Sequence, residues 1–466
     1  MLSWLSYAAS PIHVLLALWV TCHVLLHKRD VRAAIGWIGT AWLAPIVGAL
    51  LYFAFGISRV KRRARRLMGA NRAIDPSLGR DVSSDDPVER LKIAISRITG
   101  EEISAGKVVA ILDSGDEAYP HMLAAIDAAK TSVDLSTYIF RTDFVGTKFI
   151  AALTRARQRG ATVRVLIDGF GGGFLLSPAY RALRKNGVPA ARFLHSALPW
   201  KMPLLDLRLH KKTLIVDRAA AYIGGLNIGA ENSNEKPAKK ATVRDLHFRV
   251  EGPVVHQIEE DFDEDWTFAT GEPPAMTPRQ PDISASGDAA RVIVAGPDQD
   301  EDQLALVLLS AINSAQHSIR IATPYFLPDE SLVTALQLAA LRGVDVQIAL
   351  PAVNNHLLVA WASRPHIEPL LQTGCRIWRG PPPFDHSKLM TIDGKWSLIG
   401  SSNWDVRSLR LNFEIALECH GADLARRLSE LFDRKRIQPV TLQEIQNRSV
   451  ILKLRDAAAR LMAPYL

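Results

Sequence analysis

The sequence predicts an α/β protein with two similar domains, preceded by a pair of apolar helices. Three observations support this prediction. Two N-terminal stretches, residues 1–27 and 33–58, contain no Asp, Glu, Lys or Arg. After about residue 106, apolar runs typical of strands alternate with amphipathic runs typical of helices, which is the pattern of an α/β core. Three blocks of this pattern then occur twice in the same order, as expected for a duplicated domain.

The two N-terminal stretches are each long enough to cross a bilayer, whose hydrocarbon core of about 30 Å needs about 20 helical residues. We therefore predict a transmembrane hairpin over residues 1–58; a buried soluble hairpin and a cleaved signal peptide are the alternatives. The loop "KRDVR" (28–32) has three positive residues, and the strip "RVKRRARRLMGANR" (59–72) has seven. Because the more positive flank stays in the cytoplasm, we expect a multi-pass protein with both termini and both domains on the cytoplasmic side.

The positive charge of the chain is concentrated in the strip 59–72. The formal net charge of +8 falls to +1 when the seven positive residues of this strip are left out. A nucleic-acid-binding protein would carry its charge along the binding face, so no nucleic-acid partner is expected. Beside an apolar hairpin, the strip suits anionic lipid headgroups, at about 1 kcal/mol per Lys or Arg; a stop-transfer flank without a further role is the alternative. The three cysteines are scattered and show no disulfide framework or zinc spacing.

The rest of the chain divides where the composition changes. Residues 268–289 are rich in Pro, Gly, Ser and Ala and are the best candidate for a linker. The C-terminal run 451–466 alternates apolar and basic residues at helical spacing; we expect it to pack on the preceding domain, with a membrane-surface helix as the alternative. The predicted parts are the hairpin (1–58), the basic strip and linker (59–106), domain 1 (107–267), a linker (268–290), domain 2 (291–436) and a C-terminal helical segment (437–466).

The duplication is visible in three pairs of segments. Residues 125–140 match 311–326 as a helix end, a turn and a strand, and residues 157–168 match 340–351 as a helix end and a strand. The third pair is "HKKTLIVDRAAAYIGGLNIG" (210–229) and "HSKLMTIDGKWSLIGSSNWD" (386–405), which repeats six residues at the same offsets. One such pattern arises easily by chance, but two in matched context indicate a functional site. The candidate site residues are His210, Lys212, Asp217, Asn227, His386, Lys388, Asp393 and Asn403.

The segment 208–217 is expected to form a strand, in which residues two positions apart share a face. His210 and Lys212 then point the same way, and the second motif repeats this arrangement. Asp217, seven positions after His210, has the opposite parity. Either the strand turns before this aspartate, or the aspartate serves the scaffold and not the reacting centre.

Together the two motifs supply two His, two Lys and two Asn, with no nearby cluster of carboxylates or cysteines that suits a metal. Lys and Asn donors around one point suit a phosphate and the charge of its transition state without a cation, so no metal or other cofactor is expected. One histidine can attack phosphorus and form a covalent intermediate. The other can protonate the leaving oxygen and then deprotonate the incoming one.

A nucleophilic imidazole needs an acceptor at its far nitrogen, so that the attacking lone pair is free. Asp245 lies 35 residues after His210, and Glu414 lies 28 residues after His386. We predict that these two are the orienting acids. His247, close to Asp245, is a further candidate for the lining of the site.

The sequence resembles the phospholipase D superfamily, whose signature is a pair of H-x-K-x4-D-x6-G-x-x-N motifs. Within it, the chain is similar to bacterial cardiolipin synthases with two N-terminal membrane segments, through "YIGGLNIG", "RDLHFRVEGPVV", "TPYFLPDESLVTAL" and "GSSNWDVRSLRLNFE". The resemblance implies two phospholipase D-type domains, each a mixed β-sheet flanked by helices, whose motifs meet in one site. It also implies a place in the bacterial inner membrane.

The implied reaction transfers a phosphatidyl group from one phosphatidylglycerol to the free glycerol hydroxyl of another, giving cardiolipin and glycerol. Phosphatidylglycerol and anionic membrane lipids are the expected partners. In this resemblance His210 is the nucleophile and His386 the general acid and base, with the Lys and Asn pairs at the phosphate. A phospholipase D that transfers the group to water is the alternative. Two acids depart from the family pattern: Asp206, where Asn is expected, and Asp385, where relatives often have an uncharged residue.

Overall fold

The structure of the chain is a computed structural model that describes residues 2–27, 31–44, 46–56, 78, 85–173, 176–195, 207–235, 242–273, 287–296 and 303–463. It consists of two units, Met1–Arg66 and Leu67–Leu466, which are described separately. The basic strip 59–72, the central part of the predicted linker (274–286) and Asp206 lie outside the described residues.

The first unit is helical. It contains α1 (Leu2–His27), α2 (Val31–Leu43), α3 (Val47–Leu51) and the π-helical turn η1 (Tyr52–Gly56), around a small apolar cluster that includes Val20, Val24 and Tyr52. The second apolar stretch, 33–58, is therefore divided and does not form one continuous helix. Pro45 stands at the division in the sequence, and proline disfavours a helical conformation in the residue before it. Among the described residues, no helix combines the length and the apolar character that a bilayer crossing requires.

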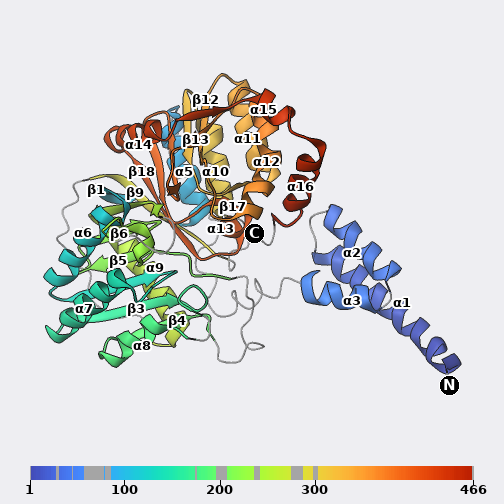
Figure 1. Cartoon of the computed structure of the whole chain (residues 1–466), viewed down its shortest axis with the longest axis horizontal. Helices are drawn as coiled ribbons and strands as arrows, with labels where there is room; N and C mark the ends of the chain where they lie inside the picture. Colours follow the sequence, from blue (N-terminus) through green and yellow to red (C-terminus); the bar gives the residue numbers. More distant parts are fainter. Residues whose placement is uncertain are drawn as a thin grey trace. The chain divides into compact units, whose positions relative to one another are not determined.

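The second unit is built on one mixed sheet of 15 strands with helices on both faces (Figure 1). Its strand order is β19-β13-β12-β10-β15-β16-β18-β9-β1-β8-β6-β5-β2-β3-β4, so that the order outward from the middle is the same in both directions, apart from the extra edge strand β19. This symmetry confirms the predicted α/β class and the duplication. The two halves are joined where β1 pairs with β9, from Ser104 opposite Ala290 to Gly106 opposite Asp288.

The strands of the first half are β1 (Ser104–Asp113), β2 (Ser132–Thr137), β3 (Thr162–Asp168), β4 (Ala190–Phe193), β5 (Thr213–Val216), β6 (Ala220–Gly224) and β8 (Leu246–Glu251). Those of the second half are β9 (Asp288–Ala295), β10 (Ser318–Ala322), β12 (Asp345–Pro351), β13 (Arg376–Gly380), β15 (Leu389–Ile392), β16 (Trp396–Gly400), β18 (Glu414–His420) and β19 (Gln438–Val440). Four short strands form two separate pairs: β7 (Val243–Arg244) with β14 (Phe384–Asp385), and β11 (Phe326–Leu327) with β17 (Trp404–Asp405).

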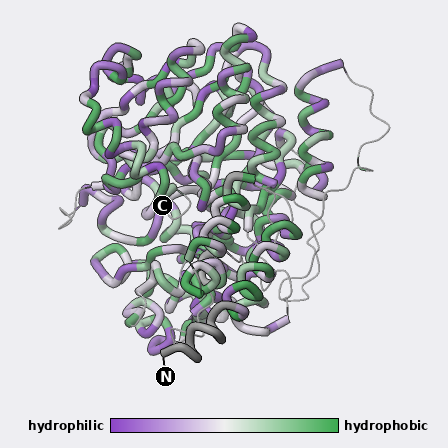
Figure 2. The backbone as a smooth tube through the Cα atoms, turned by 90° about the vertical axis from the view of Figure 1, so that its right-hand side faces the viewer, coloured by the Kyte–Doolittle hydropathy of each residue, from purple (hydrophilic) through white to green (hydrophobic). Residues whose placement is uncertain are grey.

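The helices of the first half are α6 (Ser114–Ala128), α7 (Phe144–Gln158), α8 (Pro178–Lys185) and α9 (Val254–Thr270), with a 3-10 turn at Ala230–Asn232. Those of the second half are α10 (Gln303–Ser314), α11 (Glu330–Leu341), α12 (Leu357–Gln372), α13 (Val406–Arg410), α14 (Ala422–Arg434), α15 (Leu442–Gln446) and α16 (Val450–Arg460). Hydrophobic and hydrophilic positions alternate along these helices, as expected for helices that cover an apolar core with one face (Figure 2). Central strands such as β5 and β18 are buried along their whole length because helices cover both faces of the sheet.

The predicted linker 59–106 contains a helix that belongs to the second half. Helix α5 (Pro87–Thr99) begins at Asp86, whose side chain accepts from the Val88 amide at 3.0 Å, and it contributes Leu91 and Ile95 to the apolar core of the second half. Arg291 on β9 is fully buried beneath it, where it pairs with Glu418 at 2.7 Å. We predicted a linker here because the region is polar in composition, but its apolar positions lie four residues apart and form one face of a helix.

Candidate active site

The two motif histidines are placed by backbone pairing between the halves. His210 precedes β5, which begins only at Thr213, so the predicted strand 208–217 is shorter than expected. Leu209 forms a β-bridge with Phe413, and the His210 amide donates to the Phe413 carbonyl at 2.9 Å. The second motif repeats this arrangement. There β14 pairs with β7, and the His386 amide donates to the Arg244 carbonyl at 2.7 Å.

This backbone pairing gives each histidine an acid from the other half. Nδ1 of His210 lies 2.8 and 2.9 Å from the two carboxylate oxygens of Glu414. Nδ1 of His386 lies 2.6 Å from Oδ2 of Asp245. In the sequence analysis each acid was paired with the histidine of its own half. In the structure each acid lies beside the histidine of the other half. Since a carboxylate can only accept, Nδ1 of each ring carries the proton and Nε2 keeps its lone pair.

Both acids are buried, and their histidine partners favour the ionised form. Burial raises the pKa of Glu414, but His210 and Lys212 outweigh this effect and lower it overall. Ser401 Oγ also donates to Glu414 at 2.5 Å. Asp245 behaves in the same way. Burial raises its pKa, and Lys388 and His386 lower it below the usual value. Each acid therefore stays charged near neutral pH and can stabilise a positive charge on its imidazole.

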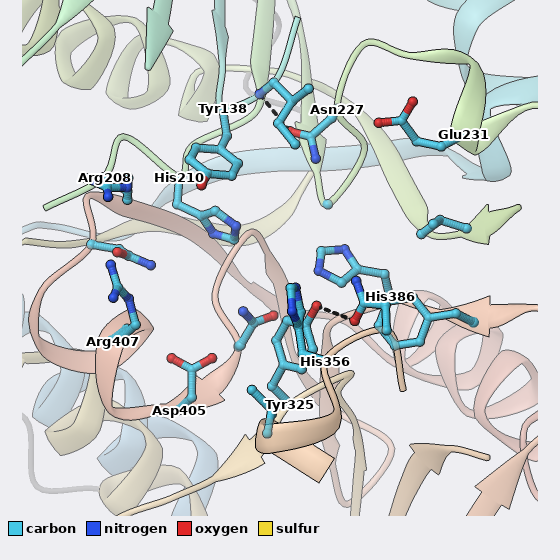
Figure 3. A pocket seen from close by; sticks show the side chains of 18 of the residues that line it. Tyr138, Arg208, His210, Asn227, Glu231, Tyr325, His356, His386, Asp405 and Arg407 are labelled. Carbon is cyan, nitrogen blue, oxygen red and sulfur yellow. Dashed lines mark hydrogen bonds between the residues drawn. The ribbon is translucent and has the colours of Figure 1, made fainter. Parts of the chain in front are cut away.

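A pocket of about 1030 Å³ lies between the two halves, and both histidines line it (Figure 3). Because the Nδ1 edge of each ring faces a buried carboxylate, the Nε2 edge faces the pocket. The two rings lie on opposite sides and face each other across it (Figure 3). Asn227 and Asn403 also line this space. Asn227 Oδ1 accepts from the Ile139 amide at 3.1 Å, which leaves its side-chain nitrogen to donate.

The two motif lysines lie behind the histidines, on the same side of the chain as predicted from the spacing of two. Each ammonium donates to the carbonyl of its own histidine. Nζ of Lys388 also lies 2.7 Å from Nδ1 of His386 and 3.6 Å from Asp245. Burial lowers the pKa of Lys212 to about 7, although Glu414 opposes the shift. Burial lowers the pKa of Lys388 as well, so an anion in the pocket would increase the charge on both lysines.

Burial of the two histidines favours their neutral form. Burial lowers the pKa of His386 to about 4, Lys388 lowers it further, and Asp245 opposes the shift. Burial also lowers the pKa of His210, against the effect of Glu414. A neutral imidazole has the free lone pair that nucleophilic attack requires. A phosphodiester anion beside the rings would raise both pKa values and so allow one ring to hold a proton.

The motif aspartates belong to the scaffold. Asp217 accepts hydrogen bonds from the backbone amides of residues 130–132 at 2.7 to 3.1 Å, and Asp393 accepts from those of residues 316–318 at 2.7 to 2.8 Å. Both have a φ of 51° because the chain turns directly after β5 and β15. Neither is among the described residues that line the pocket. Both were predicted as site residues together with the catalytic histidines; their contacts instead agree with the alternative that the aspartate serves the scaffold.

The residue between His and Lys in each motif points to the opposite side of the sheet. Lys211 is buried against Asp261 and Asp265 of α9, at 2.7 Å from each. In the second motif Asp385 pairs with Lys435, which also contacts Ser387. Burial raises the pKa of Asp385, but Lys435 outweighs it and lowers the value overall. Asp385 thus has its own cation and does not add an uncompensated charge to the pocket.

Two tyrosines and several charged residues of the pocket were not predicted from the sequence. The rings of Tyr138 and Tyr325 lie 5.3 and 5.7 Å from those of His210 and His386, edge to face. A tyrosine near the end of each matched segment, 125–140 and 311–326, was the available signal. The charged residues include Arg208, Arg407 and Asp405 on one side and Glu231 on the other, where Glu231 pairs with Arg141 at 2.8 Å (Figure 3). His247 is buried behind Gly224 and is not among the described residues of the lining.

Comparison with known proteins places this site in a family. Residues 122–266 and 308–436 match the family described as "Cardiolipin synthase, PLD-like domain", and residues 15–56 match "Phospholipase_D-nuclease N-terminal". The chain is 30% identical to "Cardiolipin synthase 1" of Bacillus anthracis, covering 95% of this chain and 91% of that protein. It is 29% identical to "Major cardiolipin synthase ClsA" of Bacillus subtilis, covering 97% and 99%.

A solved structure shares the fold. The phosphatidylserine synthase of Haemophilus influenzae superposes with a TM-score of 0.63 at 16% identity, covering 81% of this chain and all of that one. The resemblance drawn from the motifs is confirmed by these matches, which extend over nearly the whole chain. The protein belongs to the family of cardiolipin synthases with phospholipase D-like domains.

Proposed function

We propose that this protein is a cardiolipin synthase, which transfers a phosphatidyl group from one phosphatidylglycerol to another and releases glycerol. One observation carries this proposal: two imidazoles face each other across one pocket, and each has its Nδ1 hydrogen-bonded to a buried carboxylate. This arrangement suits attack on phosphorus from one side and protonation of the leaving oxygen on the other. The names of the relatives agree with this reaction.

In the first step Nε2 of His210 attacks phosphorus, an N–P bond forms, and the P–O bond to glycerol breaks. His386, which holds a second proton at Nε2 once the phosphodiester anion is bound, gives that proton to the departing glycerol oxygen. In the second step His386 takes the proton of the incoming glycerol hydroxyl, whose oxygen displaces His210 from phosphorus. The assignment of His210 as nucleophile follows the family resemblance, because the geometry of the two rings is nearly symmetrical.

The lysine and asparagine pairs are proposed to bind the phosphate. Lys212 and Lys388 lie behind the histidines at a depth where an approaching anion favours their charged form. Asn227 can donate from its side-chain nitrogen. Donors fixed before the reaction stabilise the added negative charge of a five-coordinate phosphorus without reorganisation.

Two arginines of the pocket favour a lipid acceptor over water. Arg208 and Arg407 lie on one side with a single acid among the described lining residues, Asp405, so the pair keeps a positive charge that can neutralise the phosphodiester of a second lipid (Figure 3). Water would need no such partner. Incubation of the purified protein with vesicles of labelled phosphatidylglycerol tests this choice. Cardiolipin and glycerol are the expected products; phosphatidic acid as the main product, with little cardiolipin, would support hydrolysis instead.

The covalent intermediate can be tested separately. After acid quenching, His386→Ala should still allow trapping of a phosphohistidine from a substrate with a reactive leaving group, whereas His210→Ala should not. A phosphohistidine on the His210→Ala protein would reverse the two assignments.

For the N-terminal unit we propose attachment to the bacterial inner membrane through residues 1–58, with the catalytic halves on the cytoplasmic side. The charge-free stretches 1–27 and 33–58 and the N-terminal family match at 15–56 support this proposal. We expect the full chain to stay in the membranes after alkaline carbonate extraction. A chain that lacks residues 1–58 should be released. Release of the full chain by carbonate would contradict it. Protease digestion of inside-out vesicles tests the sidedness.

A further inference from the structure

Helix α16 carries its apolar side chains outward. Val450, Ile451, Leu454 and Leu461 are 71%, 78%, 65% and 76% exposed. Positions 450, 454, 457 and 461 fall on one face of a helix, and Ala457 between them is also exposed. A helix on the surface of a soluble domain normally turns such a face toward the core. In α16 the apolar face is the one turned away.

The inward face of α16 is held by a buried charge. Asp456 has a side chain that is only 4% exposed, and it accepts from Arg448 at 2.6 Å and from Arg455 at 2.8 Å. Beside it, Ala459 packs into a small apolar cluster with Val359 and Ala362 of α12. Arg364 of α12 also lies 3.5 Å from Asp456, so this ion pair and the cluster fix the rotation of α16, which lies beside α12 (Figure 1). The outward apolar face is therefore a consequence of specific contacts on the other side.

The exposed charges of α16 itself are positive. Asp456 is the only acid between residues 450 and 463, and its side chain is buried. Lys453 and Arg460 are exposed. A face of Val, Ile and Leu with exposed Lys and Arg beside it, and without an exposed acid, is complementary to a bilayer surface that contains anionic lipid.

The inward face of α16 contacts α12, which also borders the pocket. Val359 lines the pocket and also belongs to the cluster that contains Ala459. Leu357 and Leu358 line the same pocket, and they are 65% and 50% exposed. Exposed leucines at the rim of a pocket that must admit a lipid headgroup provide a second apolar surface next to α16.

We propose that the outward face of α16, with Leu357 and Leu358 at the pocket rim, inserts into the interfacial region of a bilayer that contains anionic lipid. Attachment there sets the mouth of the pocket at the depth of the lipid phosphates, so that a substrate lipid reaches the histidines while its acyl chains stay in the bilayer. The inference rests on the proposed function, since it assigns the source of the substrate for that same pocket. The sequence-based alternatives for the C-terminal run are then both fulfilled, because one face packs on the domain and the other binds the membrane.

The first test measures where α16 lies. Leu454→Cys in the full chain, with the exposed Cys22 changed to Ser, is labelled with an environment-sensitive fluorophore and reconstituted into vesicles containing phosphatidylglycerol; Cys375 and Cys419 are buried. We expect a blue-shifted emission that is quenched by lipids carrying a nitroxide on the acyl chain. The matched control is Gln443→Cys, at an exposed polar position of α15, whose label should be quenched by aqueous iodide instead. A label at 454 that is quenched by iodide, or that is shielded from both quenchers by protein, overturns the proposal.

The second test separates membrane docking from chemistry. The triple variant Ile451→Ser, Leu454→Ser and Leu461→Ser should lose about tenfold or more of its transfer activity on phosphatidylglycerol in vesicles, since each apolar side chain contributes to partitioning. It should keep wild-type activity on monomeric short-chain phosphatidylglycerol in solution. The control variant Leu338→Ser, Leu341→Ser changes exposed leucines of α11 and should behave as wild type in both assays. Unchanged vesicle activity of the triple variant overturns the docking proposal, whereas absence of transfer by the wild type on either substrate overturns the proposed function.

Discussion

The contact between His210 and Glu414 predicts that Glu414→Gln slows the formation of the covalent intermediate. The two carboxylate oxygens lie 2.8 and 2.9 Å from Nδ1 of the ring. When Nε2 attacks phosphorus, the ring acquires a positive charge that the carboxylate stabilises. With about 4 Å between the charge centres and an effective dielectric constant of about 20, this attraction is about 4 kcal/mol. A neutral amide of the same shape removes it, so the expected loss in rate is about a thousandfold.

A phosphatidyl ester with p-nitrophenol as the leaving group isolates this step, because that leaving group departs without protonation. The burst of p-nitrophenol in a stopped-flow experiment then reports formation of the phosphohistidine. Glu414→Gln should slow the burst by about three orders of magnitude. The matched variant Asp245→Asn affects the acid and base His386. It should keep the burst and slow only the later turnover.

A normal burst in Glu414→Gln, or equal loss of the burst in both variants, would refute the assignment of one acid to each step. The folding control is direct. Ser401 donates to Oε2 of Glu414 and Asn412 donates to Oε1, so the single oxygen of Gln can keep one of these two bonds. The thermal unfolding midpoint of the variant is therefore measured first, and the burst is recorded well below it.

Three further predictions follow from the site. Asp217→Asn should destabilise the protein by about 1 to 3 kcal/mol in denaturant unfolding, with kcat of the folded protein unchanged, because it weakens charged hydrogen bonds of the scaffold. Burial raises the pKa of Asp217, but the amides it binds lower it overall. The stability that this carboxylate contributes is therefore present above its unfolded pKa of about 3.9 and is lost as the pH falls through its folded pKa. The variant should accordingly lose less stability than the wild type on acidification. Burial lowers the pKa of His210, although Glu414 opposes the shift. At low substrate concentration, where the rate reports the free enzyme, the burst rate should therefore decline only below about pH 6.5, and a midpoint above that value would contradict the neutral nucleophile. Arg407→Gln should raise the ratio of phosphatidic acid to cardiolipin several-fold, whereas Arg410→Gln, whose side chain pairs with an acid outside the pocket, should not change it.

The reacting groups could be predicted because their signal is local. Residues two positions apart in an extended segment share a face, which was enough to place Lys212 with His210. The parity of Asp217 was enough to question its place at the phosphate, and its contacts with backbone amides agree with that doubt. The pairing of the acids has no such local signal. A pseudo-symmetric chain allows each histidine to meet the acid of its own half or of the other half.

Long-range strand pairing decides between these arrangements. The bridge between Leu209 and Phe413 places Glu414 beside His210, and no pattern within either segment specifies that partner. Helix α5 is a different case. Local signals mark its start at Asp86 and Pro87 and its end at Gly100. The polar composition of the surrounding region nevertheless predicted a linker. Contacts between residues distant in sequence decide which of the two halves α5 packs on.

The pairing of each histidine with an acid of the other half means that both halves are needed to complete the site. One half alone would hold one histidine, and that histidine would lack its carboxylate. A symmetric dimer of identical halves would restore both, so the crossing itself does not require two different halves. A symmetric dimer would, however, carry the same charges at both ends of its pocket. In this chain the residue 21 positions after the motif histidine is Glu231 in the first half and Arg407 in the second, and both line the pocket. Joining the halves in one chain allows these positions to differ, so that the two sides of the pocket can bind different groups.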